Sequence, residues 1–256
     1  MKKFIIIIAI LFFITACNQS NNSTSGGIQW VGENEIANAF VRKGIFHWYN
    51  VEWEKSYTYF TGALEQDPTL FAPHVVLAWL SPGEKETLHV DKAKELVSGK
   101  NENSQLFVSM LDLRGADNRE KRHAIWKQMH ESHPTGGFIH YLYANTNPDP
   151  NERIKELESL LDQKKAEDGW YYHILNLLGY AHYNNGNKEK AKSYFDEYVD
   201  VYPEGYNPHD SMGEYYYNEE DYETSLVHYQ KALDNYPMSN SAINKVNELV
   251  EKLGIE

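Results

Sequence analysis

A repeat with a period of about 34 residues is the feature that most constrains how this chain can fold. The stretch LLGYAHYNNGNKEKAKSYFDEYVDVYP, from Leu177, aligns with SMGEYYYNEEDYETSLVHYQKALDNYP, from Ser211, and the closing prolines, Pro203 and Pro237, lie one period apart. A fixed period of this length is typical of solenoids, in which each unit buries its apolar face against the next one. We therefore expect a stack of helix pairs, with no strand of any length.

Small and aromatic residues recur at fixed places within the period. Gly179 corresponds to Gly213, and Phe195 corresponds to Tyr229. Small residues allow two helices to approach closely at their crossing, while larger apolar side chains fill the grooves between ridges. The same register occurs near the front of the chain, at Gly44, Ser56, Phe60, Ala63 and Pro68. These positions define three clear repeats, at residues 37–70, 172–205 and 206–239.

This order of small, aromatic and proline positions resembles the tetratricopeptide repeat. The resemblance implies an all-α fold, a right-handed α-solenoid of helix-turn-helix units. Pro134 lies close to two periods after Pro68 and close to two periods before Pro203. Residues 71–102, 103–136 and 137–170 are therefore interpreted as three degenerate units. Arg122 and Tyr198 stand where the family usually has small residues, so local packing should differ there.

The last segment, SAINKVNELVEKLG, is predicted to be an amphipathic helix. Its apolar residues fall on one helical stripe, and Gly254 is a typical helix stop. The members of the stripe are Ile243, Val246, Leu249, Val250 and Leu253. We expect a capping helix at 241–253 that covers the last repeat, and a single solenoid domain over 36–254.

The N-terminus is predicted to be a lipoprotein signal. MKKFIIIIAILFFITAC has two lysines followed by an apolar run of signal-peptide length, and ITAC resembles the bacterial lipobox. The resemblance implies cleavage after residue 16 and lipidation of Cys17. The alternative is a plain N-terminal anchor with a chance cysteine. Residues 17–35 are expected to act as a flexible tether, because NQSNNSTSGG has no large apolar side chain. Asn18 favours the outer membrane facing the periplasm, by resemblance to lipoproteins of two-membrane bacteria. In a one-membrane bacterium, the same signal would imply the outer face of the cell membrane.

Charge and motif spacing exclude several functions. A formal net charge of -13 argues against a nucleic-acid partner, and one cysteine excludes an internal disulfide framework. His209, Asp210 and Ser211 are consecutive on an expected helix, so they cannot converge as a triad. HESH, residues 130–133, lacks the histidine spacing of a zinc helix, and a helix-end role is favoured. No histidine is seen at ligand spacing from a carboxylate. We therefore expect no catalytic residue, metal or cofactor, and no enzyme.

The family resemblance implies a binding groove lined by the first helix of each repeat. In the last two repeats the predicted groove residues are His173, Asn176, Tyr180, Tyr183, Asn184, Asp210, Glu214, Tyr217 and Asn218. The corresponding positions of the first repeat are Asn38, Val41, Ile45, Trp48 and Tyr49. Tyrosine combines a rigid apolar body with a polar tip, which suits extended chains and sugars. The alternative is that these tyrosines belong to the core.

Two functions follow from this groove. The favoured one is a membrane-anchored, non-catalytic adaptor that binds envelope proteins of unknown identity, with the membrane reached through the Cys17 lipid. The other is a lipoprotein receptor for a glycan or small ligand. Family members that capture acidic C-terminal tails use basic groove residues, whereas the matching positions here are Asn176, Tyr180, Asp210 and Ser211. Capture of an acidic tail is therefore not expected.

Overall fold

The computed structural model describes residues 26–255, and within that range it contains thirteen α-helices, two short 3-10 helices and no strand. Twelve helices form six successive pairs: α1 (Glu35–Tyr49) with α2 (Trp53–Gln66), α3 (Phe71–Leu80) with α4 (Glu84–Leu96), α5 (Glu102–Ser109) with α6 (Arg119–Ser132), α7 (Gly137–Thr146) with α8 (Pro150–Ala166), α9 (Tyr172–Asn184) with α10 (Lys188–Val201), and α11 (Tyr206–Asn218) with α12 (Tyr222–Asn235). The last helix, α13 (Asn240–Leu253), packs on α12. The all-α solenoid prediction is confirmed.

Local sequence explains where many of the helices begin and end. The side chains of Asn34, Asn101 and Asp149 accept hydrogen bonds from backbone N–H groups in the first turns of α1, α5 and α8. Such caps satisfy donors that have no partner inside the helix. At the other end of the chain, Gly254 ends α13 in the left-handed conformation, with φ 64°. The sequence thus marks the individual helices by itself.

Three helix pairs each contain the same kind of close crossing between a glycine and an aromatic ring. A Cβ atom added to Gly44, Gly179 or Gly213 would lie 3.0, 2.4 or 3.0 Å from the aromatic ring on the following helix. The rings belong to Phe60, Phe195 and Tyr229. A serine also donates to the glycine carbonyl at two of these crossings. Ser56 Oγ lies 3.0 Å from the Gly44 carbonyl oxygen in the first pair, and Ser225 Oγ lies 2.8 Å from the Gly213 carbonyl oxygen in the sixth. The period of the sequence is therefore a period of helix crossings.

The third pair departs from this pattern. Helix α5 is short, and residues 110–118 between α5 and α6 contain both 3-10 helices. Arg122, which replaces a small residue, turns toward this connection and donates to the carbonyls of Leu113 and Gly115, the latter at 2.8 Å. The side chain therefore stabilises the long connection instead of a helix crossing.

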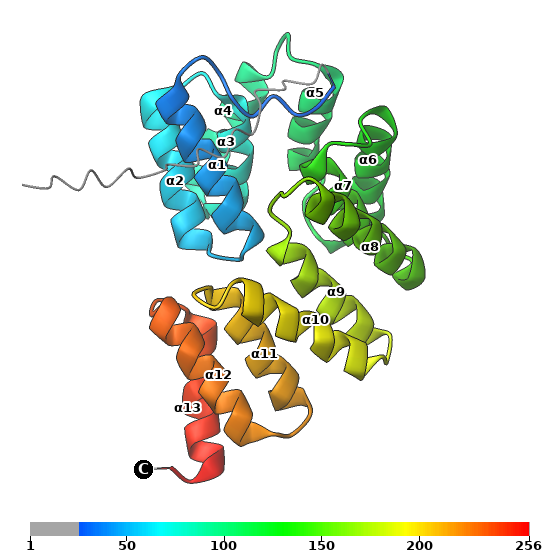
Figure 1. Ribbon diagram of the computed structural model, residues 1–256. Coiled ribbons are helices and arrows are strands. Elements are labelled where there is room, and N and C mark those ends of the chain that lie inside the picture. The colour runs from blue at the N-terminus through cyan, green and yellow to red at the C-terminus, as the bar shows by residue number, and fades with distance from the viewer. Residues whose placement is uncertain (1–25, 256) are drawn as a thin grey trace, which may run out of the picture.

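The solenoid curves until its first pair meets its last two. Figure 1 shows the pairs following a curved path, from α1 and α2 in blue to α11–α13 in orange and red, which return beneath the first pair. The buried Tyr198 hydroxyl donates to Asn50 Oδ1 at 2.9 Å and accepts from Asn207 Nδ2 at 3.1 Å. Tyr236 also donates to Glu54. The unexpected tyrosine at position 198 is thus a contact between the two ends of the solenoid.

The start of the described chain is packed against the solenoid. Trp30 lies between the rings of Phe107 and Phe138, with centroid distances of 5.4 and 4.8 Å. The Asn38 side chain binds both the N–H of Gly32, at 2.9 Å, and its carbonyl oxygen, at 3.0 Å. Our expectation of a flexible tether as far as residue 35 therefore does not hold for residues 26–35, because Ile28 and Trp30 supply apolar surface that packs inside the curve.

The predicted signal peptide at 1–16 and the lipidation site Cys17 lie outside the described residues. Between residues 26 and 255, no helix has both the length and the apolar character that crossing a bilayer requires.

Candidate functional site

The nine predicted groove residues of the last two repeats lie on α9 and α11, at different depths. His173 and Asn176 are buried, with 5% and 8% of their surface exposed. Asn184 and Asn218, at the ends of the two helices, are exposed. The five residues between them are half-buried: Tyr180, Tyr183, Asp210, Glu214 and Tyr217. The predicted groove positions that are not buried are therefore these five and the two asparagines, and we call this set the C-terminal groove.

Tyrosine hydroxyls in the C-terminal groove donate to carboxylates of the following unit. Tyr180 donates to Glu214 Oε2 at 2.5 Å, and Tyr183 donates to Glu219 Oε1 at 2.9 Å. Tyr217 donates to Glu248 on α13. Hydrogen bonds to an ionised acceptor are short and strong, so they fix the rings in one orientation. The three tyrosines lie on α9 and α11, and the hydrogen bond of Tyr217 extends the series to α13.

Asp210 is the most perturbed acid of the C-terminal groove. Burial raises the pKa of its carboxyl to about 6, although the hydrogen bond from Tyr206, at 2.7 Å, favours the charged form. The nearby Glu214 carboxylate raises the pKa further. Burial and the charges of Glu214 and Asp210 also raise the pKa of Tyr180, which therefore remains a neutral hydrogen-bond donor. The groove is acidic above about pH 6 and less so below it.

The corresponding positions of the first repeat are buried or, at Ile45, Trp48 and Tyr49, half-buried and packed against hydrophobic clusters. Asn38 and Val41 are buried, while Trp48 and Tyr49 pack against rings from α7 and α9. Tyr49 lies flat on the ring of His173, with a centroid distance of 4.0 Å and an interplanar angle of 8°. Burial lowers the pKa of His173 to about 3, so this imidazole is neutral. His173 is thus a packed contact between the first and fifth pairs.

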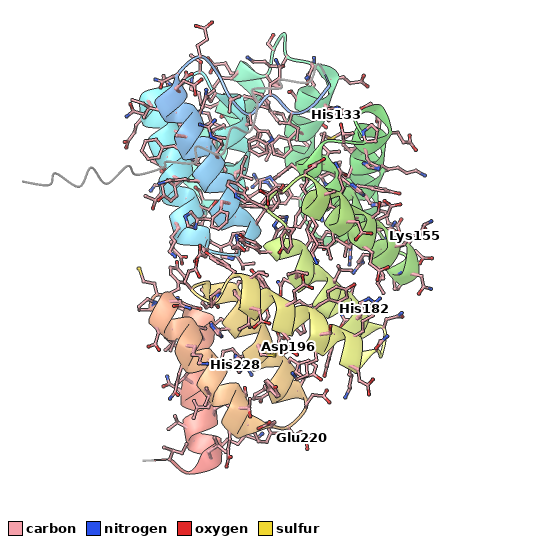
Figure 2. All side chains as sticks on the ribbon, in the orientation of Figure 1. His133, Lys155, His182, Asp196, Glu220 and His228 are labelled. Carbon is pink, nitrogen blue, oxygen red and sulfur yellow. The ribbon has the colours of Figure 1, made fainter. Side chains whose placement is uncertain are left out.

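The expectation that no histidine is paired with a carboxylate is wrong. His140 Nε2 lies 3.1 Å from Glu156 Oε2, His182 Nε2 lies 3.7 Å from Glu158 Oε1, and His47 is paired with Glu52. Glu156 and Glu158 both lie on α8, and their histidine partners lie on the neighbouring helices α7 and α9. Figure 2 labels His182, which lies on α9. Linear spacing could not show such pairs, because they form only when helices pack.

The stretch HESH divides between two roles. His133 is the C-terminal cap residue of α6, and its backbone N–H donates to the carbonyls of Met129 and His130. The predicted helix-end role is therefore seen for His133. His130 instead approaches His140 and Glu156, and one potential ligand atom from each of these three residues lies within 4.8 Å of the others. Burial and the neighbouring His140 lower the pKa of His130.

The consecutive His209, Asp210 and Ser211 do not converge. His209 Nε2 lies 3.0 Å from the Pro203 carbonyl oxygen, and its Nδ1 lies 3.3 Å from His228 Nδ1. Asp210 instead accepts from Tyr206. A nucleophile–base–acid relay needs the histidine to contact both partners, so these three residues cannot form one.

A polar cavity of about 500 Å³ lies beside α6, the end of α7 and the start of α8. Its lining includes Arg119, His123 and Arg153, together with Asp117 and Glu120. Arg153 is partly engaged, because its Nε and Nη2 donate to the Asn147 carbonyl at 3.0 and 2.6 Å. The mixed charges of this lining do not select one sign of ligand.

Comparison with known proteins agrees with the repeat architecture. Residues 172–204 match the family model described as tetratricopeptide repeat. Human IFIT1, in a dimer with m7Gppp-AAAA, is similar over 84% of this chain and 56% of its own, at 11% identity and a TM-score of 0.52. The Cut9–Hcn1 structure of APC/C is matched over 85% of this chain and 43% of its own, at 13% identity and a TM-score of 0.49. The pilus biogenesis factor PilW is matched over 86% of this chain and 87% of its own, at 13% identity and a TM-score of 0.43.

These similarities concern the fold alone, since the identity is 11% for IFIT1 and 13% for the other two. The chain spans about half of the IFIT1 chain and less than half of the Cut9–Hcn1 chain that it matches. No curated protein matches the sequence. By its helix pairs and their crossings, the chain is an all-α solenoid, in which residues 172–204 match the tetratricopeptide repeat.

Proposed function

We propose that this protein is a non-catalytic adaptor that binds another protein in its C-terminal groove and is held at the bacterial cell envelope by a lipid on Cys17. The observation that carries the docking site is the difference between the two ends of the solenoid. The first repeat's groove positions pack against rings of the distant helices α7 and α9, whereas the tyrosines of α9 and α11 pack on rings of adjacent helices and donate to acids of the following unit.

The side chains of the C-terminal groove favour a neutral or basic partner segment. Asp210 and Glu214 supply negative charge, and no basic residue is among the members of the groove. Fixed tyrosine rings and the exposed amides of Asn184 and Asn218 can stack on, and hydrogen-bond to, an extended chain. Association should therefore weaken as salt screens the acidic groups.

Site-specific photo-crosslinking tests the docking site. A photoreactive residue at Asn184 or Asn218, the exposed ends of the groove, should crosslink the partner in cells. The same residue at Val227 or Met238, which are 48% and 67% exposed and lie outside the groove, should not. The captured protein is then purified and its binding measured against salt. Equal crosslinking from all four positions would place the docking surface elsewhere.

A double variant separates binding from folding. Tyr180→Ala with Tyr217→Ala should abolish binding of the crosslinked partner while the melting temperature stays within a few degrees. Tyr59→Ala, at a half-buried tyrosine on α2, serves as the matched control and should bind normally. Unfolding of the double variant would show that the rings are core. In that event Glu214→Gln, which keeps the shape of the side chain, tests the groove instead. A Glu214→Gln variant that binds as tightly as the native chain would exclude the groove.

The lipid anchor has its own test. Cys17→Ser should prevent metabolic labelling with palmitate and release the protein from membranes. If the Cys17→Ser variant is processed normally and stays in the membrane fraction, the anchor is removed from the proposal without affecting the docking site. If instead a glycan raises the melting temperature and no protein is crosslinked, the receptor function is favoured.

A further inference from the structure

Three potential metal ligands meet at the junction of α6, α7 and α8. His130 comes from α6, His140 from α7 and Glu156 from α8, and one ligand atom from each lies within 4.8 Å of the others. His140 Nε2 and Glu156 Oε2 are already 3.1 Å apart. Two ligand atoms bound to one ion at about 2.0–2.1 Å, with a tetrahedral angle between them, are separated by a little over 3 Å. This edge of the site thus has the separation that a bound ion requires.

The rings are held by packing. His130 is stacked on Tyr143, with a centroid distance of 4.8 Å and an interplanar angle of 11°. His123, which lies earlier on α6, is stacked on the same tyrosine at 5.4 Å. His130 and His140 face each other at 4.5 Å with an interplanar angle of 32°. Because Tyr143 is held between two histidines of α6, His130 is kept at the junction before any ion arrives.

The hydrogen bonding of the two imidazoles is incomplete. The Nδ1 atoms of His130 and His140 are buried and have no hydrogen-bond partner, while the other ring nitrogen of His140, Nε2, faces Glu156. The His140 side chain is 6% exposed, and Glu156 is 23% exposed. Buried polar atoms are usually paired, and an unpaired one in a folded protein calls for a bound water, an ion or a functional role. His130 and Glu156 are both half-buried, so two of the three side chains reach solvent.

We propose that His130, His140 and Glu156 bind a divalent transition-metal ion, with Zn²⁺ the preferred species. Two imidazole nitrogens and one carboxylate oxygen are a ligand set typical of zinc, and they disfavour the oxygen-only cations Mg²⁺ and Ca²⁺. Three protein ligands leave a fourth position for water. The ion would join the fourth helix pair to the third, which has the shortest helix and the longest connection. The site therefore stabilises the most irregular part of the solenoid.

The chain offers an internal control. Glu158, also on α8, and His182 on α9 form a second histidine–glutamate pair at the next helix junction, with Oε1 and Nε2 3.7 Å apart, and the ring of His182 is stacked on Tyr194. Among residues 26–255, His130, His140 and Glu156 form a group of three potential metal ligands, whereas His182 and Glu158 belong to no such group. The two junctions therefore differ in the second histidine and in Glu158, which is already paired with Lys190 at 2.6 Å.

Calorimetric titration of the metal-free chain with zinc chloride tests the proposal. One ion should bind per chain, zinc in excess should raise the melting temperature by several degrees, and magnesium chloride should do neither. Glu156→Gln and His140→Asn should each weaken zinc binding at least tenfold, since each removes a ligand. His182→Asn should bind zinc like the native chain. Circular dichroism establishes that each variant is folded, and Glu156→Gln, at a partly exposed position, preserves the shape of its side chain.

The opposing result is equally clear. If the native chain binds no zinc, or if Glu156→Gln and His182→Asn have the same effect, the three residues form a hydrogen-bonded ring cluster only. These outcomes do not depend on the C-terminal groove, which lies on different helices.

Discussion

At the residue scale, the glycines of the helix crossings set the spacing between paired helices. Gly179 leaves no room for a side chain, because a Cβ there would be 2.4 Å from Cε1 of the buried Phe195 ring. Gly179→Ala should therefore lower the free energy of unfolding by about 1–3 kcal/mol, as overpacking does in cores. Chemical denaturation measures this change.

Gly62 provides the matched control for this substitution. Its Cβ would lie 3.3 Å from the half-buried ring of Phe40, which has space to move, and alanine is the better helix former by up to about 1 kcal/mol. Gly62→Ala should be neutral or stabilising. A Gly179→Ala variant as stable as Gly62→Ala would mean that the crossing in the fifth pair is looser than the structure shows.

Asp210 should make stability depend on pH. Its folded-state pKa of about 6 exceeds the ordinary value of 3.8, so the folded chain binds more protons than the unfolded chain between these values. The free energy of unfolding therefore falls as the pH rises from about 4 to about 6. Asp210→Asn should remove this decrease in stability with pH. Because the pKa of Asp210 is raised by about two pH units on folding, the variant should be more stable than the native chain at pH 7 by on the order of 1–3 kcal/mol.

Denaturation of both proteins at pH 4 and pH 7 tests this expectation. The variant and the native chain should differ least at pH 4. Asp234→Asn, at an exposed carboxylate on α12, measures the general effect of removing one negative charge. An Asp210→Asn variant that is less stable than the native chain at pH 7 would show that the charged form is favoured by the fold.

At the element scale, the segment before α1 behaves as part of the core. Trp30 contacts rings from the first, third and fourth pairs, including Phe60 at 6.3 Å and Phe138 at 4.8 Å. Trp30→Ala should cost about 3 kcal/mol of stability, at the lower end of the range for a large aromatic residue, because Trp30 is half-buried. Trp79→Ala is the matched control, since Trp79 is 50% exposed, and it should cost far less. Equal effects on the melting temperature would mean that the segment is only loosely held.

At the scale of the whole molecule, Tyr198 joins the two ends of the curved solenoid. Tyr198→Phe removes a buried hydroxyl and leaves the amides of Asn50 and Asn207 without this partner, which should cost about 1–3 kcal/mol. Small-angle X-ray scattering should also show a larger radius of gyration if the ends separate. Tyr194→Phe, which removes a half-buried hydroxyl 3.3 Å from Glu158, should change neither quantity by much. A Tyr198→Phe variant with native stability would show that the ends are held by apolar contacts alone.

The helices and their pairing could be predicted from the sequence, because they depend on neighbours within one period. Gly179 and Phe195 are close in the chain and repeat as Gly213 and Tyr229, so their contact could be predicted from the register. The capping helix was predictable for the same reason, from one apolar stripe on a short segment. Local contacts of this kind leave a trace in the spacing of residues.

Only the tertiary structure decided which surfaces stay open. His173 and Tyr180 are both groove positions of one helix, yet His173 is covered by Tyr49 from the far end of the chain, whereas Tyr180 reaches Glu214 in the next unit. The His130–His140–Glu156 cluster likewise forms from three helices whose faces meet only after packing. Small changes of angle between successive pairs add up to the curvature of a solenoid, so contacts between distant repeats depend on the sum of many packing angles and leave no periodic signal in the sequence.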